Sequence, residues 1–153
     1  MASILRLPGP LALSSFRRER LLERLQSLPG AIADVTARYV HFVHTDGPLS
    51  DADAKRLDQL LHYGEPFVAG PAGQSLLVIP RLGTLSPWAS KATDIARNCG
   101  LDGVRRIERG VLYTLSPKRG LLSGFTGTKT LSSEDLAAVA SVLHDRMTET
   151  VVD

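Results

Sequence analysis

Residues 80–100 read Pro80-Arg-Leu-Gly-Thr-Leu-Ser-Pro-Trp-Ala-Ser-Lys-Ala-Thr-Asp-Ile-Ala-Arg-Asn-Cys-Gly100 and predict, in this order, the end of a strand, a turn and a helix. Ser86 is a typical N-cap residue, and Pro87 suits the first helical position because its missing N–H is not needed there. Gly100 is expected to end the helix. The predicted buried seam of this helix consists of Trp88, Ala92, Ile95 and Cys99, the last as a core thiol.

The N-terminus of this predicted helix is suited to binding an anion. Backbone N–H groups at a helix start point outward, and basic and hydroxyl side chains lie close to them in the sequence. A plain helix cap, with Arg81 in solvent and Lys91 paired with Asp94, explains the same pattern. The alternative is a contact site for an anionic substrate or a partner domain, formed by Arg81, Thr84, Ser86, Trp88 and Lys91.

The order of predicted elements occurs twice in the chain. Leu13-Ser14-x-Phe16 has the same pattern as Leu85-Ser86-x-Trp88, and Leu49-Ser50-x-x-Asp53 returns 82 residues later as Leu131-Ser132-x-x-Asp135. Such self-similarity indicates an internal duplication. We therefore expect one domain, 1–153, made of halves 1–70 and 71–150.

Each half is predicted to have the order βαββα. Strand patterns cover residues 3–7, 32–44, 76–79 and 104–115, and Glu108-Arg109-Gly110 offers a turn that would fold the last of these into a hairpin. This predicts an α+β fold of two fused, duplicated ferredoxin-like halves packed about a pseudo-twofold axis. Residues 116–130 are expected to be a mobile loop. The last helix is expected to begin at Ser132 or Ser133 and to bury Met147. Residues 148–153 are expected to run on in helical register without a stop signal, so that the natural chain would continue past Asp153.

Composition narrows the class of protein. The 153 residues carry a net charge of +2 and one cysteine, which precludes an internal disulfide and a multi-cysteine metal site. No apolar run approaches the roughly 20 residues of a membrane-spanning helix. Balanced charge disfavours nucleic acid as a partner. RNA binding through Tyr39, Phe42 and Tyr113 is disfavoured because Phe42 and Tyr113 are expected at equivalent places in the two halves rather than on neighbouring strands. A cytoplasmic location and no bound cofactor or metal are expected.

No catalytic set of side chains stands out. His41 and His44 would face opposite sides of a strand, and His62 and His144 are placed at helix ends. The segment 124–130 lacks the glycine that precedes the lysine of a phosphate-binding loop. Three basic residues fall on one face of the first predicted helix: Arg17, Arg20 and Arg24. Glu19 and Glu23 interleave with them, so this face is interpreted as solvated rather than as a phosphate-binding surface. The chain alone is therefore expected to be catalytically inert.

The stretch from Arg81 to Ala96 resembles the signature block of the N-terminal domain of large-type phosphoribosylformylglycinamidine synthase, the ATP- and glutamine-dependent amidotransferase of purine synthesis. Ala89 departs from it, because the family has a serine there, and residues 116–130 are longer than the corresponding connection. Further segments resemble the family in the same order: Leu13-Ser14-x-Phe16, Tyr39-Val40-His41-Phe42, Gly64, Ile107-Glu108-Arg109-Gly110-Val111 and residues 143–149.

The resemblance implies a role in a larger enzyme. The parent synthase converts formylglycinamide ribonucleotide, glutamine and ATP to formylglycinamidine ribonucleotide, with ATP, magnesium and the glutaminase cysteine in later domains. This chain would be a scaffold that docks on the linker, synthetase and glutaminase domains and supports ammonia transfer and substrate binding. The alternative is a stand-alone ferredoxin-like regulatory module that binds a small anionic metabolite at the Ser86 helix start.

Overall fold

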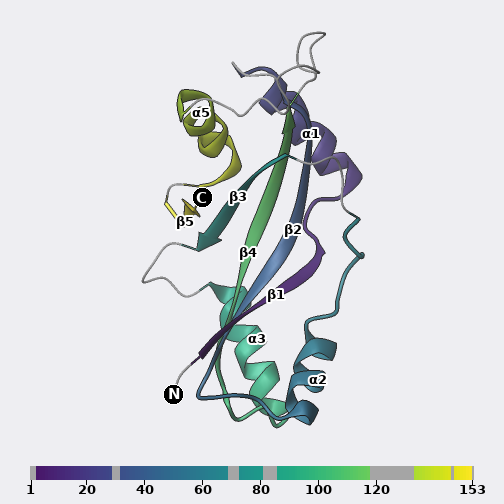
Figure 1. Ribbon diagram of the computed structural model, residues 1–153, viewed down its shortest axis with the longest axis vertical. Helices are drawn as coiled ribbons and strands as arrows, with labels where there is room; N and C mark the ends of the chain where they lie inside the picture. Colours follow the sequence, from purple (N-terminus) through teal and green to yellow (C-terminus); the bar gives the residue numbers. More distant parts are fainter. Residues whose placement is uncertain are drawn as a thin grey trace.

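The computed structural model describes residues 3–28, 32–68, 73–80, 86–117, 133–145 and 147–152 (Figure 1). No helix among these residues is long and apolar enough to cross a membrane. The elements follow one another along the chain as β1 (Ser3–Leu11), α1 (Ser15–Gln26), β2 (Ile32–Thr45), α2 (Asp51–Leu60), β3 (Gln74–Pro80), α3 (Pro87–Asn98), β4 (Val104–Pro117), α5 (Ser133–Leu143) and β5 (Glu149–Val152).

The strands form one antiparallel sheet in the order β1-β2-β4-β3-β5. Its centre is the pairing of the two longest strands, β2 and β4, which have 14 residues each and place His41 opposite Arg109. The expectation that Phe42 and Tyr113 lie on strands that are not neighbours is therefore wrong, because β2 and β4 are paired. The architecture is α+β and compatible with a ferredoxin-like fold.

The predicted order βαββα is wrong in both halves, because β2 and β4 are each one continuous strand. The expected hairpin at Glu108-Arg109-Gly110 does not form, since β4 passes straight through these residues. Pairing with β2 supplies hydrogen bonds along the whole strand, so no turn is needed. Glycine at position 110 instead lets β3 pack close to β4. A Cβ there would lie 3.0 Å from the carbonyl oxygen of Val78 and 3.1 Å from Cγ2 of Ile79.

The four helices that the structure describes pack on one face of the sheet. Side chains alternate between faces along a strand, and Val35 and Val43 of β2 lie on the same face as their partners Leu115 and Ile107. Helices α1 and α5 cover one end of this face, and α2 and α3 cover the other (Figure 1).

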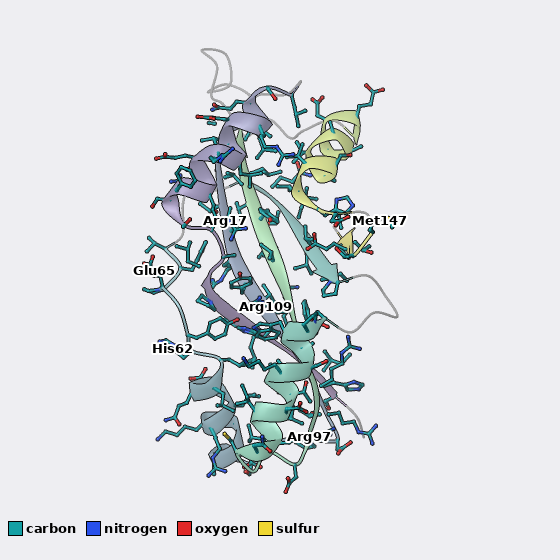
Figure 2. All side chains as sticks on the ribbon, turned by 180° about the vertical axis from the view of Figure 1, so that it is seen from behind. Arg17, His62, Glu65, Arg97, Arg109 and Met147 are labelled. Atoms are coloured by element: carbon teal, nitrogen blue, oxygen red, sulfur yellow. The ribbon has the colours of Figure 1, made fainter. Side chains whose placement is uncertain are left out.

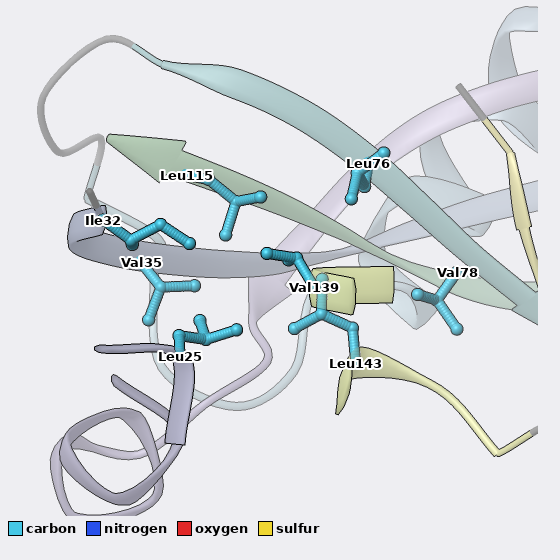
Figure 3. Packing of buried hydrophobic residues seen from close by; sticks show 8 residues of the cluster. All are labelled: Leu25, Ile32, Val35, Leu76, Val78, Leu115, Val139 and Leu143. Carbon is cyan, nitrogen blue, oxygen red and sulfur yellow. The ribbon is translucent and has the colours of Figure 1, made fainter. Parts of the chain in front are cut away.

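Each pair of helices has its own core. Figure 3 shows the first, which consists of Leu25, Ile32, Val35, Leu76, Val78, Leu115, Val139 and Leu143. The second consists of Val43, Leu57, Leu61, Ala96, Leu101, Val104 and Ile107. Completely burying one such leucine or valine stabilises the fold by roughly 1.5–3 kcal/mol. The middle of the sheet lies between these two cores.

The predicted helix starts are confirmed where the structure describes them. The hydroxyls of Ser14, Ser50 and Ser86 each accept a hydrogen bond from the backbone N–H three residues later. Gly100 ends α3 with a φ of 86°, a conformation that glycine adopts without steric cost. Ser133 begins α5, and Ser132 lies outside the described residues.

Two expectations about buried and helical residues are wrong. In the predicted buried seam of α3, Cys99 and Ile95 are exposed, because the helix turns Ala89 and Ala96 toward the sheet instead. The C-terminal segment does not continue the last helix. It turns after Asp145 and pairs as β5 with the edge of β3, where Leu77 lies opposite Val152.

Met147 therefore lies outside the helix and is 77% exposed. Three β-branched residues in succession, Thr150, Val151 and Val152, favour the strand over the helix. Of the segment 116–130, residues 116 and 117 end β4, and the others lie outside the described residues.

Candidate functional site

A cluster of aromatic and basic side chains lies at the middle of the sheet, and we call it the central cluster. Figure 2 labels one of its members, Arg109, between the two helix pairs. Two members of the cluster lie at helix ends: Tyr63 comes three residues after the end of α2, and Trp88 is the second residue of α3. The others project from the middle of β2 and β4. The cluster consists of Tyr39, His41, Tyr63, Trp88 and Arg109.

Local sequence explains how these side chains are directed. Strand alternation places Tyr39, His41 and Arg109 on the helix-covered face, because His41 and Arg109 are paired in register. The Ser86 cap and Pro87 fix the first turn of α3, which sets the position of Trp88. Gly64, with a φ of 69°, turns the chain immediately after Tyr63.

Arg109 lies between two aromatic rings. Its guanidinium carbon is 4.1 Å from the centre of the Tyr39 ring and 4.4 Å from that of Trp88. One of its N–H groups also donates a 3.2 Å hydrogen bond to the hydroxyl of Tyr63. Contacts of this kind contribute about 0.5–2 kcal/mol each. Arg109 forms no ion pair with any residue that the structure describes, so its charge is held by aromatic faces.

His41 is completely buried in the central cluster. Its Nε2 lies 2.8 Å from the hydroxyl of Tyr63, and its ring stacks on Trp88 with centres 5.7 Å apart. Burial, assisted by the positive charge of Arg109, lowers the pKa of His41 to about 4. The imidazole is therefore neutral at physiological pH.

Tyr63 connects His41 to Arg109. Burial raises the pKa of the Tyr63 hydroxyl, although the hydrogen bond and the charge of Arg109 act in the opposite direction. The phenol is therefore protonated at neutral pH. Nδ1 of His41 has no hydrogen-bond partner in the described part of the chain, so one polar atom of the cluster is buried without compensation.

Ser86 anchors α3 to the sheet as well as capping it. Its hydroxyl donates a 3.0 Å hydrogen bond to Glu108, while accepting one from the N–H of Ala89. Further along α3, the hydroxyl of Thr93 accepts a bond from the N–H of Ile107. Both bonds tie α3 to β4 at residues that have no β3 partner, one through the Glu108 side chain and one through the Ile107 backbone.

Trp88 and Lys91 line an apolar pocket of about 360 Å³ between α2 and α3. Lys91 is exposed at this pocket, and Ile95, on the same side of α3, is 44% exposed. Tyr63 contributes to both the pocket and the central cluster. The pocket and the central cluster therefore adjoin each other through Tyr63 and Trp88, which belong to both.

The structure brings together part of the predicted site. Ser86, Trp88 and Lys91 lie along the first turns of α3, whereas Arg81 and Thr84 lie outside the described residues. Sequence reasoning gave no functional role to Tyr63 or Arg109. Segments 39–42 and 107–111 both carry the family resemblance, and the structure pairs them directly in the sheet.

Within the described ranges, no three His, Cys, Asp or Glu side chains are placed to hold a metal ion. A family model matches residues 38–153, and its description is formylglycinamide ribonucleotide amidotransferase N-terminal. The matched range includes the whole central cluster and every residue of the predicted site. The chain belongs to the N-terminal family of formylglycinamide ribonucleotide amidotransferase, a ligase of purine biosynthesis.

Proposed function

We propose that this chain is a scaffold and docking domain of phosphoribosylformylglycinamidine synthase. The synthase would convert formylglycinamide ribonucleotide, glutamine and ATP to formylglycinamidine ribonucleotide. ATP and magnesium would bind in other domains, and this segment alone would be inert. Its partners would be the linker, synthetase and glutaminase domains of the same enzyme, in the cytoplasm.

One observation carries the proposal. The surface formed by the α2–α3 pocket and the central cluster combines an apolar recess with Lys91 at the pocket and an Arg109 that lacks a described acidic partner. Protein interfaces favour this combination of aromatic anchors and arginine. Arg81, Thr84 and Ser86 would extend the same surface. They would contact either a partner domain or the substrate phosphate.

We also propose that the two halves descend from a duplication. The antiparallel pair β1–β2 has a counterpart in β3–β4, and α1 and α3 follow β1 and β3 with the same serine cap. One half by itself would leave one edge of its longest strand, β2 or β4, without a partner strand. The pairing of β2 with β4 covers both of these edges. Superposition of 3–60 on 74–143 tests this proposal, because unrelated halves would not share strand register and helix placement.

The complete synthase provides the functional test. Trp88→Ala and Lys91→Ala should lower glutamine-dependent activity several-fold while leaving activity with saturating free ammonia nearly unchanged, because docking and ammonia transfer are bypassed there. Lys55→Ala, on the exposed side of α2, is the matched control. Equal activity of the Lys91 and Lys55 variants with glutamine would refute the docking surface.

The substrate role is tested separately. Arg81→Ala and Lys91→Ala should raise the KM for the ribonucleotide if this end of α3 meets its phosphate. An unchanged KM with reduced glutamine-dependent activity would assign the surface to domain contact alone.

A further inference from the structure

A second cavity lies between α1 and α5, on the opposite side of the central cluster from the α2–α3 pocket. It has a volume of about 380 Å³, within the range of small-molecule sites. Leu13 and Leu143 contribute apolar walls, and Tyr113 of β4 adds a phenol. Three arginines of α1 also line it: Arg17, Arg20 and Arg24.

The charge of these arginines is not balanced within the described residues. None of the three forms an ion pair there, in contrast to their neighbour Arg18, which pairs with Asp34. At 3.6 residues per turn, Arg17, Arg20 and Arg24 share one side of α1. Glu19 and Glu23 interleave with them along the sequence, but neither lines the cavity or forms an ion pair with these arginines among the described residues.

The position of Arg17 opposes the stability of its own helix. The first turn of α1 contains no acidic residue, whereas α2 and α5 begin with acidic side chains. A cation at a helix start is unfavourable, because the N-terminal end of the helix dipole is positive. A local conflict of this kind is typical of a functional site. An anion in the cavity would relieve it.

Glu149 of β5 is the acidic group that approaches from the sheet. It raises the pKa of Tyr113, after burial as the larger cause, while the charge of Arg17 acts in the opposite direction. The Tyr113 hydroxyl therefore stays protonated, as a hydrogen-bond donor. Three guanidiniums and one carboxylate leave an excess of about two positive charges, which matches a phosphate monoester at about −1.5 to −2.

We propose that the α1–α5 cavity is a binding site for a small organic phosphate with an apolar body. Guanidinium groups bind phosphate oxygens through paired N–H donors, and Tyr113 supplies a further donor. The apolar body packs on the leucine side of the cavity. This site is separate from the docking surface, so its loss leaves the docking proposal unaffected.

Isothermal titration of the chain with phenyl phosphate tests the site, with inorganic phosphate as the charge-only probe and phenol as the apolar-only probe. Phenyl phosphate should bind at least about tenfold more tightly than either probe, because its phosphate contacts the arginines while its ring packs on the leucine side of the cavity. The variant Arg17→Gln/Arg24→Gln should lose at least about tenfold in affinity. Arg6→Gln/Lys55→Gln removes the same charge at exposed positions elsewhere and should bind like the parent chain.

Three results would overturn the proposal. The first is equal binding by the two double variants, which would reduce the effect to net charge. The second is inorganic phosphate binding as tightly as phenyl phosphate, which would remove the role of the apolar walls. The third is an acidic, leucine-containing peptide competing at lower concentration than phenyl phosphate, which would identify the cavity as a protein contact. Circular dichroism of each variant distinguishes lost binding from lost folding.

Discussion

His41 and Arg109 lie opposite each other on β2 and β4 and are connected through one phenol, the hydroxyl of Tyr63. Arg109 donates to that oxygen, and Nε2 of His41 lies 2.8 Å from it. Arg109 also lowers the pKa of His41, in addition to the larger effect of burial. The middle of the sheet is therefore stabilised by coupled polar contacts rather than by an aliphatic core.

Arg109→Met should destabilise the chain. The change retains the length of the side chain but removes the charge from between Tyr39 and Trp88 and the bond to Tyr63. The expected loss in the free energy of unfolding is about 1–3 kcal/mol, measured by urea denaturation. Arg6→Met, at an exposed position of β1, is the control. A loss no larger than that of the control would show that the aromatic contacts of Arg109 contribute nothing.

Stability should fall as the pH falls from 7 to 4. The unfolded chain takes up a proton on His41 near pH 6.5, whereas the folded chain resists it until about pH 4. A histidine with a depressed pKa contributes its stability above the unfolded value and loses it below, here by roughly 3 kcal/mol at the acid end. Urea denaturation at several pH values measures this slope. His41→Gln should flatten it and the exposed His62→Gln should not, so identical slopes in both variants would exclude His41 as the cause.

Ser86→Ala should cost more than the other serine caps. Removing an N-cap typically costs about 1 kcal/mol. The Ser86 hydroxyl also donates to Glu108, whereas the only described hydrogen bond of the Ser50 hydroxyl is the capping bond that it accepts from the N–H of Asp53. Comparing urea midpoints of Ser86→Ala and Ser50→Ala isolates the contact with the sheet. Equal midpoints would indicate that Ser86 acts only as a cap.

Gly110→Ala should strain the centre of the sheet. The new methyl group would lie 3.0 Å from the Val78 carbonyl oxygen and 3.1 Å from Ile79, and backbone cannot move away cheaply. We expect a loss of about 1–3 kcal/mol in the free energy of unfolding. Gly103→Ala is the matched control, because its nearest contact is an ordinary 3.6 Å from Leu49. A melting temperature equal to that of the control would contradict the close packing of β3 on β4.

Several features could be predicted from the sequence because they depend on neighbours in the chain. A serine cap bonds to the third residue after it, so the starts of α1, α2 and α3 follow from local patterns. Of the predicted site, Trp88 and Lys91 lie beside the same pocket because they are three residues apart on one helix. The same reasoning failed for Gly110, since a glycine signals a turn and a close approach equally well.

The sequence by itself determined the helix starts, the Gly100 stop and membership of the family. Tertiary structure decided that β4 is one continuous strand, that residues 149–152 form a strand, and that Tyr63 and Arg109 meet His41 and Trp88. The physical reason is the range of the interactions. A cap is completed within three residues, whereas a strand needs a partner strand, and the central cluster forms only where β2, β4 and the ends of two helices converge.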